Sequence, residues 1–400
     1  MVKSDERLGL YFHFPYCSHR CPYCDFTLTT EAIPHQDYLE ACIREINNRI
    51  EYLGRESWQP RPLTSLYFGG GTPGLWATEE LGQFIHFCRE KFGFSAEIEI
   101  TLEANPAEVN LPLLITWANL GINRLSLGVQ SMRQSVLDRL GRMHTPNQVK
   151  QVVEWARLAN IMRLNLDLIH GLSGEGVAEA LFDLEALLTL NPSHISLYQL
   201  TIEPQTSFGA RARRGEQLLE PEEELLKIYR ALSCRLEQAH MPLYEVSNAA
   251  LKGEESQHNL LYWTMGDYLG IGTGAHGRIN LPGQMQRGIR WQNTRSPKAY
   301  LKAGLTSPDS TLLSMIEEDA GLLNIEALDE ETVIVGLRLS KGLILNQRLL
   351  DRYGCHAKRL IQEGLLHQTH STTSAPLGRW IATARGTELL DHLCFRLILG

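Results

Sequence analysis

Short apolar runs alternate with helical patterns over the first 250 residues, and this alternation constrains the fold more than any other feature. Six runs rich in Leu, Ile, Tyr or Phe are closed by turn or polar residues, which predicts β-strands at 9–14, 62–68, 97–102, 123–128, 163–168 and 193–200. Apolar residues at helical spacing predict helices at 36–53, 78–92, 111–120, 145–159, 178–190 and 221–239. Six β–α repeats predict an α/β fold with a parallel sheet curled into an incomplete barrel.

Unusual polar or glycine-rich segments occur at five consecutive predicted strand ends. They are Cys17 to Cys24, Gly69-Gly-Gly-Thr-Pro73, Glu103-Ala-Asn-Pro106, Gly128-Val-Gln130 and Asn165-Leu-Asp167. Functional residues of β/α barrels gather where strands end and loops to the helices begin. The sequence therefore predicts one site at this edge of the sheet.

The first of these segments carries three cysteines, Cys17, Cys21 and Cys24, spaced C-x3-C-x2-C, with no fourth cysteine after them. Three thiolates can hold a [4Fe–4S] cluster at three irons and leave the fourth iron open, as a reactive metal site requires. Zinc completed by His13 or His19 is the main alternative, although zinc pairs usually come with a second distant pair. Three buried small apolar side chains are a further alternative.

Composition limits the remaining possibilities. The 400 residues are 43% hydrophobic and 21% charged with a net charge of −8, which is typical of a globular chain of two domains or a barrel with an appendage. The chain lacks a dense Lys/Arg tract, which argues against nucleic acid as the principal partner. Scattered cysteines and the absence of a signal segment or of an apolar run of about 18–20 residues predict a cytoplasmic protein.

The alternation fails beyond about residue 240. One more strand and turn at 244–248 precede Gln257-His-Asn-Leu-Leu-Tyr-Trp263 and a glycine-rich stretch at 268–277. Helices are predicted at 329–339, 346–353, 356–363 and 386–397, with a hairpin at 365–370 and 380–383. We expect three parts, a barrel at 1–240, a connecting segment at 241–312, and a mostly helical, winged-helix-like domain at 313–400. Such modules can bind DNA, but this one lacks an obvious basic recognition helix.

The cysteine spacing, with Tyr23 before the last cysteine, resembles that of the radical S-adenosylmethionine (SAM) superfamily. The strand-end motifs, together with Leu140-Gly-Arg142 and Tyr244-Glu-Val-Ser-Asn248, are similar to those of the oxygen-independent coproporphyrinogen III oxidase-like radical SAM proteins. Within that group the match is closest to the HemW-type haem chaperones and extends over roughly 9–280. The resemblance implies a radical SAM barrel with a [4Fe–4S] cluster on the three cysteines and SAM beside it.

The residues that the resemblance assigns to SAM are Tyr11, Gly70, Gly71, Thr72, Glu103, Gln130, Arg142 and Asp167. Glycines let the backbone approach a ligand closely, and the planar fork of Arg142 suits a carboxylate. Glu103, Gln130 and Asp167 can hydrogen-bond with the ammonium group and the ribose hydroxyls of SAM. Arg142 can also be a surface arginine, and the other three can be satisfied polar residues at strand ends.

Two departures distinguish this chain from the decarboxylating oxidases. They carry a further cysteine at the position of Phe26, and their N-terminal extension is longer than the eight residues that precede strand 1 here. Oxidative decarboxylation of coproporphyrinogen, an oxidoreductase activity, is therefore the alternative rather than the first hypothesis.

His258-Asn-Leu-Leu-Tyr-Trp263 matches the H-N-x-x-Y-W segment of the haem-binding chaperones. A neutral imidazole is a good haem ligand, Tyr262 and Trp263 offer flat faces, and a helix would place His258 and Tyr262 on one side. Without the resemblance, the simpler interpretation of His258 is a polar surface histidine beside two core aromatics. His276, in the glycine-rich stretch, is either a ligand or a turn residue. We expect a protein that takes up haem and passes it to an acceptor protein, with membrane-associated acceptors and a homodimer among the possibilities.

Overall fold

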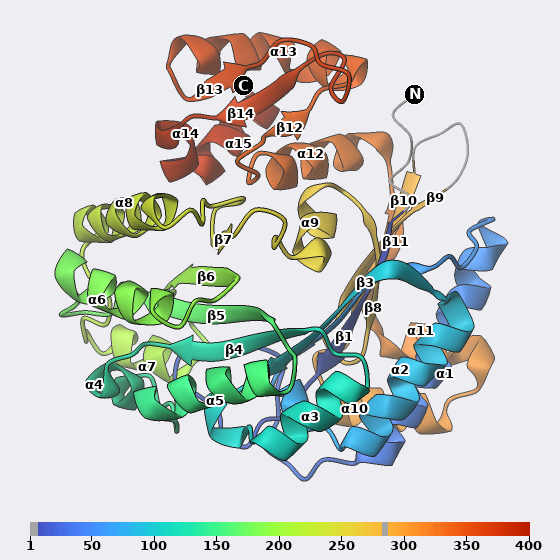
Figure 1. Cartoon of the computed structure of the whole chain (residues 1–400). Coiled ribbons are helices and arrows are strands. Elements are labelled where there is room, and N and C mark those ends of the chain that lie inside the picture. The colour runs from blue at the N-terminus through green and yellow to red at the C-terminus, as the bar shows by residue number, and fades with distance from the viewer. Residues whose placement is uncertain (1–6, 282–286) are drawn as a thin grey trace.

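The computed structural model describes residues 7–281 and 287–400 (Figure 1). Six parallel strands lie side by side in chain order, β1 (Leu8–Phe14), β2 (Leu63–Gly70), β3 (Phe94–Ala104), β4 (Arg124–Gln130), β5 (Arg163–His170) and β6 (His194–Gln199). The α/β class and the incomplete barrel expected from the sequence are confirmed. All six carboxyl ends meet at one edge, because the strands are parallel and follow one another in register.

Five further strands extend this sheet to eleven. At one end β7 (Asn248–Ala250) pairs antiparallel with β6. At the other end β8 (Asp267–Ile271) runs parallel to β1 and continues into the antiparallel strands β9 (His276–Leu281), β10 (Arg287–Asn293) and β11 (Glu317–Leu323). The strand predicted at 244–248 begins only at Asn248. The strands β8 to β11 are not predicted from the sequence.

The glycine-rich stretch at 268–277 explains why β8 and β9 were not predicted. Its glycines look like turn residues, but Gly270 and Gly277 serve close packing within the sheet. A Cβ on Gly270 would lie 1.8 Å from the carbonyl oxygen of His276, and one on Gly277 would lie 2.0 Å from the ring of Trp291. A strand that needs glycine for close approach carries no apolar alternation that a sequence pattern could detect.

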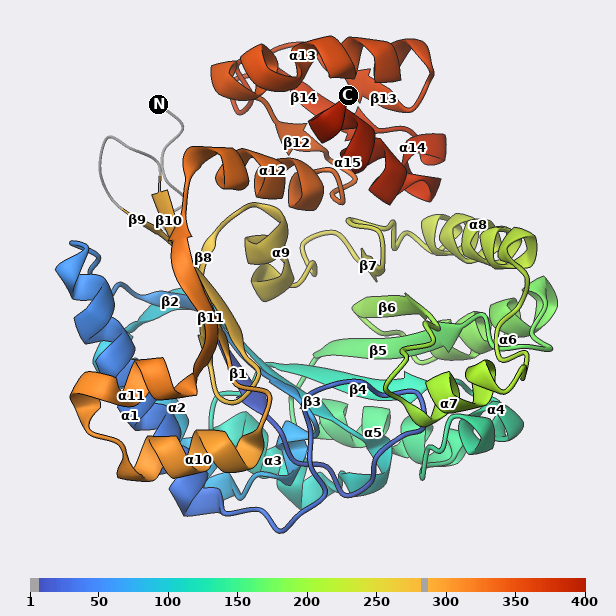
Figure 2. The same cartoon turned by 180° about the vertical axis from the view of Figure 1, so that it is seen from behind.

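Helices cover the convex face of the sheet (Figures 1 and 2). They are α1 (His35–Arg55), α2 (Thr78–Phe92), α3 (Leu111–Asn119), α5 (Pro146–Leu158), α6 (Val177–Leu188) and α8 (Glu222–Gln238). The short helices α4 (Gln134–Arg139) and α7 (Ser207–Arg213) pack in a separate cluster at the carboxyl ends of β5 and β6. Two more, α10 (Pro297–Thr306) and α11 (Asp309–Ile316), pack on α1. The core between sheet and helices is aromatic, and Phe12 stacks on Trp76 at 4.7 Å and contacts Phe84 at 4.6 Å between ring centroids.

The short helix α9 (Gln257–Trp263) lies on the opposite, concave side, where it packs on β1, β2 and β8. The helix α12 (Ile325–Gly336) of the C-terminal module contacts α9 from above (Figure 1). The haem-motif segment is therefore helical, the condition under which His258 and Tyr262 share a face, and it lies between the barrel and the C-terminal module.

The C-terminal module combines helices with a three-stranded sheet of order β12-β14-β13. Its elements after α12 are β12 (Leu343–Ile344), α13 (Gln347–Gln362), β13 (Leu366–Gln368), β14 (Arg379–Ala382), α14 (Ala384–Glu388) and α15 (Leu390–Leu399). The predicted hairpin forms, with Leu366 opposite Ala382. The two helices expected at 346–353 and 356–363 are one helix, because Gly354 continues the helix instead of ending it.

The main hydrophobic core reaches Ile316, and a second core begins at Val333. The division of the chain at 240 and 312 stays a prediction. Among the helices described, none is both long and apolar enough to cross a bilayer.

Candidate functional site at the carboxyl ends of the strands

The three cysteines lie on the loop that follows β1, and all are free and half-buried. The loop is anchored by its backbone, because the amide of Cys17 donates to the carbonyl of Thr29 (3.0 Å) and the amide of Cys24 donates to that of Cys21 (3.2 Å). Burial raises the pKa of Cys17 to about 11 and also raises that of Cys24. Such thiols stay protonated near neutral pH unless a metal centre takes them up as thiolates.

The glycine turn after β2 fits against this loop without space for a side chain. The amide of Gly71 donates to the carbonyl of Phe14 (2.7 Å), and the amide of Thr72 donates to that of Tyr16 (2.8 Å). A Cβ on Gly71 would lie 2.7 Å from the Tyr16 carbonyl oxygen and 3.0 Å from the Cys17 Sγ. The Thr72 hydroxyl donates to that same sulfur at 3.4 Å. The first and second strand ends thus form one cradle.

Glu103 faces this cradle from the end of β3. Its carboxylate accepts hydrogen bonds from the Tyr67 hydroxyl (2.7 Å) and from the amide of Gly70 (3.1 Å), which has a φ of +112°. Burial raises the pKa of Glu103 to about 7; Tyr67 and Gly70 oppose the increase, and Asp167 adds to it. This carboxyl group consequently titrates near neutral pH, which is a frequent property of functional sites.

Arg142 reaches the cysteine loop from the segment after α4. Its Nη1 lies 3.6 Å from the Cys21 Sγ, and its Nη2 donates to the Asn105 side chain and to the carbonyl of Gly128. Asn105 in turn donates to the Thr72 hydroxyl at 2.9 Å. Arg142 is therefore part of the site rather than a surface arginine, and Asn105, which the sequence reasoning left without a role, connects it to the glycine turn.

Gln130 is held in a strained conformation at the end of β4. Its φ is +69°, a region that residues other than glycine rarely adopt, and its buried Oε1 has no hydrogen-bond partner among the described residues. Both features cost free energy unless a ligand compensates for them. They favour Gln130 as a ligand contact.

Asp167 belongs to a buried polar network. Asn165 donates to Asp167 and to the Ser126 hydroxyl, both at 2.8 Å, and its Oδ1 accepts from His194 at 2.6 Å. Burial raises the pKa of Asp167 to about 6. In the sequence Asn165 stands out only as a neighbour of Asp167, whereas its four side-chain hydrogen bonds make it the centre of this network.

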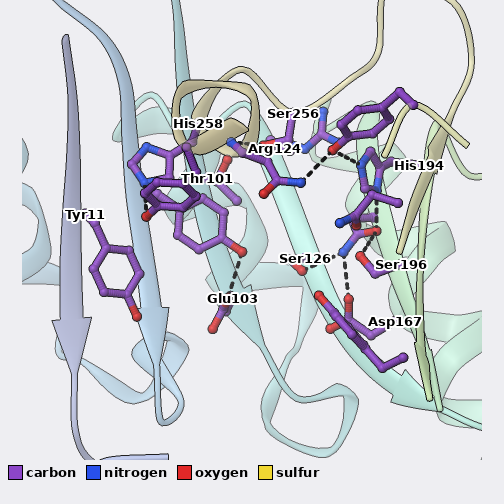
Figure 3. Close-up of a pocket in the computed structure, with 17 residues that line it drawn as sticks. Tyr11, Thr101, Glu103, Arg124, Ser126, Asp167, His194, Ser196, Ser256 and His258 are labelled. Carbon is purple, nitrogen blue, oxygen red and sulfur yellow. Dashed lines mark hydrogen bonds between the residues drawn. The ribbon is translucent and has the colours of Figure 1, made fainter. Parts of the chain in front are cut away.

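Two adjoining cavities lie beside these residues, with Glu103, Asn165 and Asp167 lining the inner one and Gly70 and Glu103 lining the outer one. The inner chamber, of about 330 Å³, lies inside the barrel and is bordered by Glu103, Asp167, His194 and His258 (Figure 3). The outer cavity, of about 480 Å³, opens between the cysteine loop and the strands β8 to β10. Its walls include Phe26, Tyr268, His276 and Arg295. The two spaces share Tyr11, Glu103 and Tyr262 as common walls.

His258 lies deep in the inner chamber, at the end opposite Asp167 (Figure 3). It is 2% exposed, and both ring nitrogens are engaged, Nδ1 with the Ser65 hydroxyl and Nε2 with the Tyr262 hydroxyl, each at 2.8 Å. The ring stacks on Tyr67 with centroids 5.1 Å apart. Burial lowers the pKa of His258 to about 3, so it is neutral. The shared face of His258 and Tyr262 is confirmed, and a ligand reaches the imidazole only if one of these bonds opens.

The structure does not bring all predicted residues together. Trp263 points away from His258 and stacks under Arg338 of the C-terminal module, with 4.5 Å between guanidinium and ring centroid. His13, the proposed zinc partner, uses Nδ1 for the Tyr11 hydroxyl (3.0 Å) and Nε2 for the carbonyl of Thr27 (2.8 Å). In this arrangement His13 supports the loop and is not available to a metal.

The partial barrel, the three-cysteine loop and the glycine cradle define a radical SAM protein, and residues 11–186 match the model of the Radical SAM superfamily. The heme chaperone HemW of Escherichia coli strain K12 is 38% identical over 304 residues, covering 76% of this chain and 77% of the relative. That of Mycobacterium tuberculosis strain H37Rv is 32% identical over 397 residues, covering 99% and 95%. The chain belongs to the HemW family.

The solved structure of coproporphyrinogen III oxidase (HemN) from Escherichia coli matches with a TM-score of 0.77. The alignment covers 98% of this chain and 90% of that one, at 22% identity. This likeness concerns the fold. It agrees with the barrel and its C-terminal module as described above.

Proposed function

We propose that this protein takes up haem and delivers it to an acceptor protein, on a barrel that binds a [4Fe–4S] cluster and SAM. The observation that carries the proposal is the convergence of the cysteine loop, the glycine cradle and the haem-motif helix α9 on two adjoining cavities. The names of the HemW relatives support the haem part. The identity of the acceptor, the homodimer and the cytoplasmic location stay predictions.

Cys17, Cys21 and Cys24 would hold the cluster. Three half-buried thiols with no fourth cysteine nearby match a cluster with one open iron, and Thr72 and Arg142 supply hydrogen bonds to two of the sulfurs. When bound, such a cluster supplies one-electron reduction of SAM. The amides and side chains around it stabilise thiolate charge, which tunes a cluster of this kind.

Glu103, Gln130, Arg142 and Asp167 would hold SAM. The unpartnered Oε1 of Gln130 suits a hydroxyl or ammonium donor, and two carboxyl groups in one chamber favour a cationic ligand. Tyr11 and Gly70 border the outer cavity together with Glu103. The residues present therefore fit the family's cofactor in charge and in hydrogen-bonding capacity.

A haem titration of anaerobically purified protein tests the function. We expect a Soret band that saturates at a defined ratio of haem to chain, and transfer of the bound haem to added apomyoglobin. Iron and acid-labile sulfide in the same sample test the cluster. Haem that binds without saturation, or that cannot be released, would contradict the proposal.

The alternative, an oxidase, is tested in the same preparation. Incubation with reductant, SAM and coproporphyrinogen should leave the propionate groups intact, because Phe26 stands where those enzymes carry a further cysteine. Formation of a vinyl product would overturn the chaperone as the principal function.

A further inference from the structure

The outer cavity contains a histidine that is open to a ligand, whereas the histidine of the haem motif is closed off. We propose that haem first binds in the outer cavity, with the His276 imidazole on its iron and Arg295 beside a propionate. This inference rests on the proposed haem carriage and specifies the site for it.

His276 has the exposure that an axial ligand needs. It is the first residue of β9, its side chain is exposed, and its ring makes no hydrogen bond to another described residue. Partial burial and the charges of Arg295 and Arg290 lower its pKa, so the neutral imidazole with a free lone pair predominates at pH 7. His258, by comparison, is 2% exposed with both nitrogens engaged.

The walls of the outer cavity suit a flat apolar macrocycle. Phe26 is 58% exposed on the cysteine loop, and Tyr268 and Tyr262 contact each other at 4.6 Å between centroids. Covering an exposed Phe ring with an apolar ligand favours binding, because it removes apolar surface from water. A volume of about 480 Å³ also lies in the usual range of ligand pockets.

Arg295 supplies a cation for a propionate. Its Nε donates to the Thr27 hydroxyl (3.2 Å) and its Nη2 to the carbonyl of Asp25 (2.9 Å), so it is fixed against the cysteine loop. These two contacts use only part of a guanidinium's five N–H donors, and the side chain is otherwise exposed. A planar guanidinium held in one position is well suited to pair with a carboxylate.

The inner chamber is the less suitable space for the macrocycle. It is smaller, about 330 Å³, and the carboxyl groups of Glu103 and Asp167 both border it. Asp25 and Glu103 border the outer cavity as well, but there the exposed Arg295 can pair with a propionate, whereas Arg124 of the inner chamber is buried against Glu99. Tyr262 separates the two spaces, and only its displacement would expose Nε2 of His258 to the outer cavity.

Titration of ferric haem into the anaerobic full-length protein tests this assignment. His276→Ala should weaken binding at least tenfold and shift the Soret band, and added free imidazole should restore the band by occupying the vacated position. His367→Ala, at an exposed histidine of the C-terminal module, is the matched control and should bind as the wild type does. Thermal unfolding checks that both variants are folded.

Arg295 is tested with haem and its dimethyl ester. The wild type should bind haem more tightly than the ester, and Arg295→Gln should reduce this preference at least threefold. Equal preference in the two proteins would remove Arg295 from the site.

The outcomes distinguish a failure of haem carriage from a failure of the site at His276. If the wild type shows no saturable Soret band, the proposed function itself fails. If the wild type binds haem and His276→Ala binds equally well, only the present inference fails. Loss of binding in His258→Phe with retention in His276→Ala would assign the iron to the inner histidine and overturn it as well.

Discussion

The absence of a side chain at Gly71 is what lets the glycine turn approach the cysteine loop. Gly71→Ala would place a Cβ 2.7 Å from the Tyr16 carbonyl oxygen and 3.0 Å from the Cys17 Sγ, two groups that cannot move independently of the loop. We expect the variant to retain at most half of the wild-type iron after anaerobic purification. Iron and sulfide analysis measures this.

Gly54→Ala is the control for that substitution. Gly54 lies in α1 with no atom within 4 Å of the added Cβ, so its replacement should leave the iron content unchanged. It should also stabilise the protein slightly, by up to about 1 kcal/mol. Equal iron in both variants would mean that the loop tolerates the contact.

Glu103 should make SAM binding pH-dependent. Its pKa of about 7, raised mainly by burial, means that it is largely protonated at pH 6 and ionised at pH 8. A cationic ligand prefers the ionised form, so affinity for SAM should rise several-fold between pH 6 and 8. Calorimetry on the wild type and Glu103→Gln measures this, and the variant should show a flatter profile.

The same carboxyl group should affect stability in the opposite sense. A carboxyl group whose pKa is higher in the folded than in the unfolded protein contributes to the free energy of unfolding below pH 4.5, the unfolded pKa. This contribution is lost as the pH rises through the folded pKa of about 7. In the absence of SAM, Glu103→Gln should therefore be more stable than the wild type at pH 8, by about 1–3 kcal/mol. Glu185→Gln, at an exposed surface pair, is the control and should show no such gain. A wild type that is the more stable at pH 8 would contradict the raised pKa.

At the scale of elements, α9 is held by its first turn. The Ser256 hydroxyl accepts from the amide of Asn259 (3.2 Å) and donates to Glu99 (3.3 Å), whose carboxylate also accepts from the amide of His258 (3.2 Å). Glu99 is fully buried, and its charge is balanced by Arg124 and Arg163 at 3.5 and 3.1 Å. The position of His258 therefore depends on an ion-pair cluster below the helix.

Ser256→Ala should loosen α9 selectively. Loss of the N-cap should cost about 1 kcal/mol of unfolding free energy, and amide exchange should accelerate within 257–263. Ser296→Ala removes the corresponding cap of α10, where Ser296 accepts from the amide of Ala299 (3.3 Å). The control should lose similar stability while exchange in α9 stays unchanged. Unaltered exchange in Ser256→Ala would show that Glu99 alone fixes the helix.

The elements also show which features a sequence can reveal. The strands β1 to β6, the three cysteines and the pairing of His258 with Tyr262 follow from local periodicity and spacing, which the chain carries within a few residues. The role of Asn165 does not, because its partners Ser126 and His194 come from two other strands. The engagement of both His258 nitrogens is likewise visible only in the fold, since Ser65 is 193 residues away in the chain.

For the molecule as a whole, the C-terminal module is fastened to the haem-motif region as well as to α8 on the outside of the barrel, where Arg230 pairs with Glu388 at 2.6 Å. Arg338 pairs with Glu245 at 3.3 Å and covers the ring of Trp263. The amide of Ser340 donates to the carbonyl of Tyr244 at 3.0 Å, and the Tyr244 hydroxyl accepts from Asn259 at 3.0 Å. One continuous set of contacts thus connects the module, the 244–248 segment and α9.

Arg338→Ala should therefore weaken the module and α9 together. The side chain of Glu245 is fully buried, so removal of its cation leaves an uncompensated charge and should cost about 3 kcal/mol in denaturant unfolding. Arg290→Ala breaks an exposed pair with Glu331 and should cost less than about 1 kcal/mol. Amide exchange should accelerate in both α9 and α12 of the first variant and in neither helix of the second. Acceleration confined to α12 would mean that α9 is held by the barrel alone, whereas acceleration in both would mean that α9 opens together with the C-terminal module.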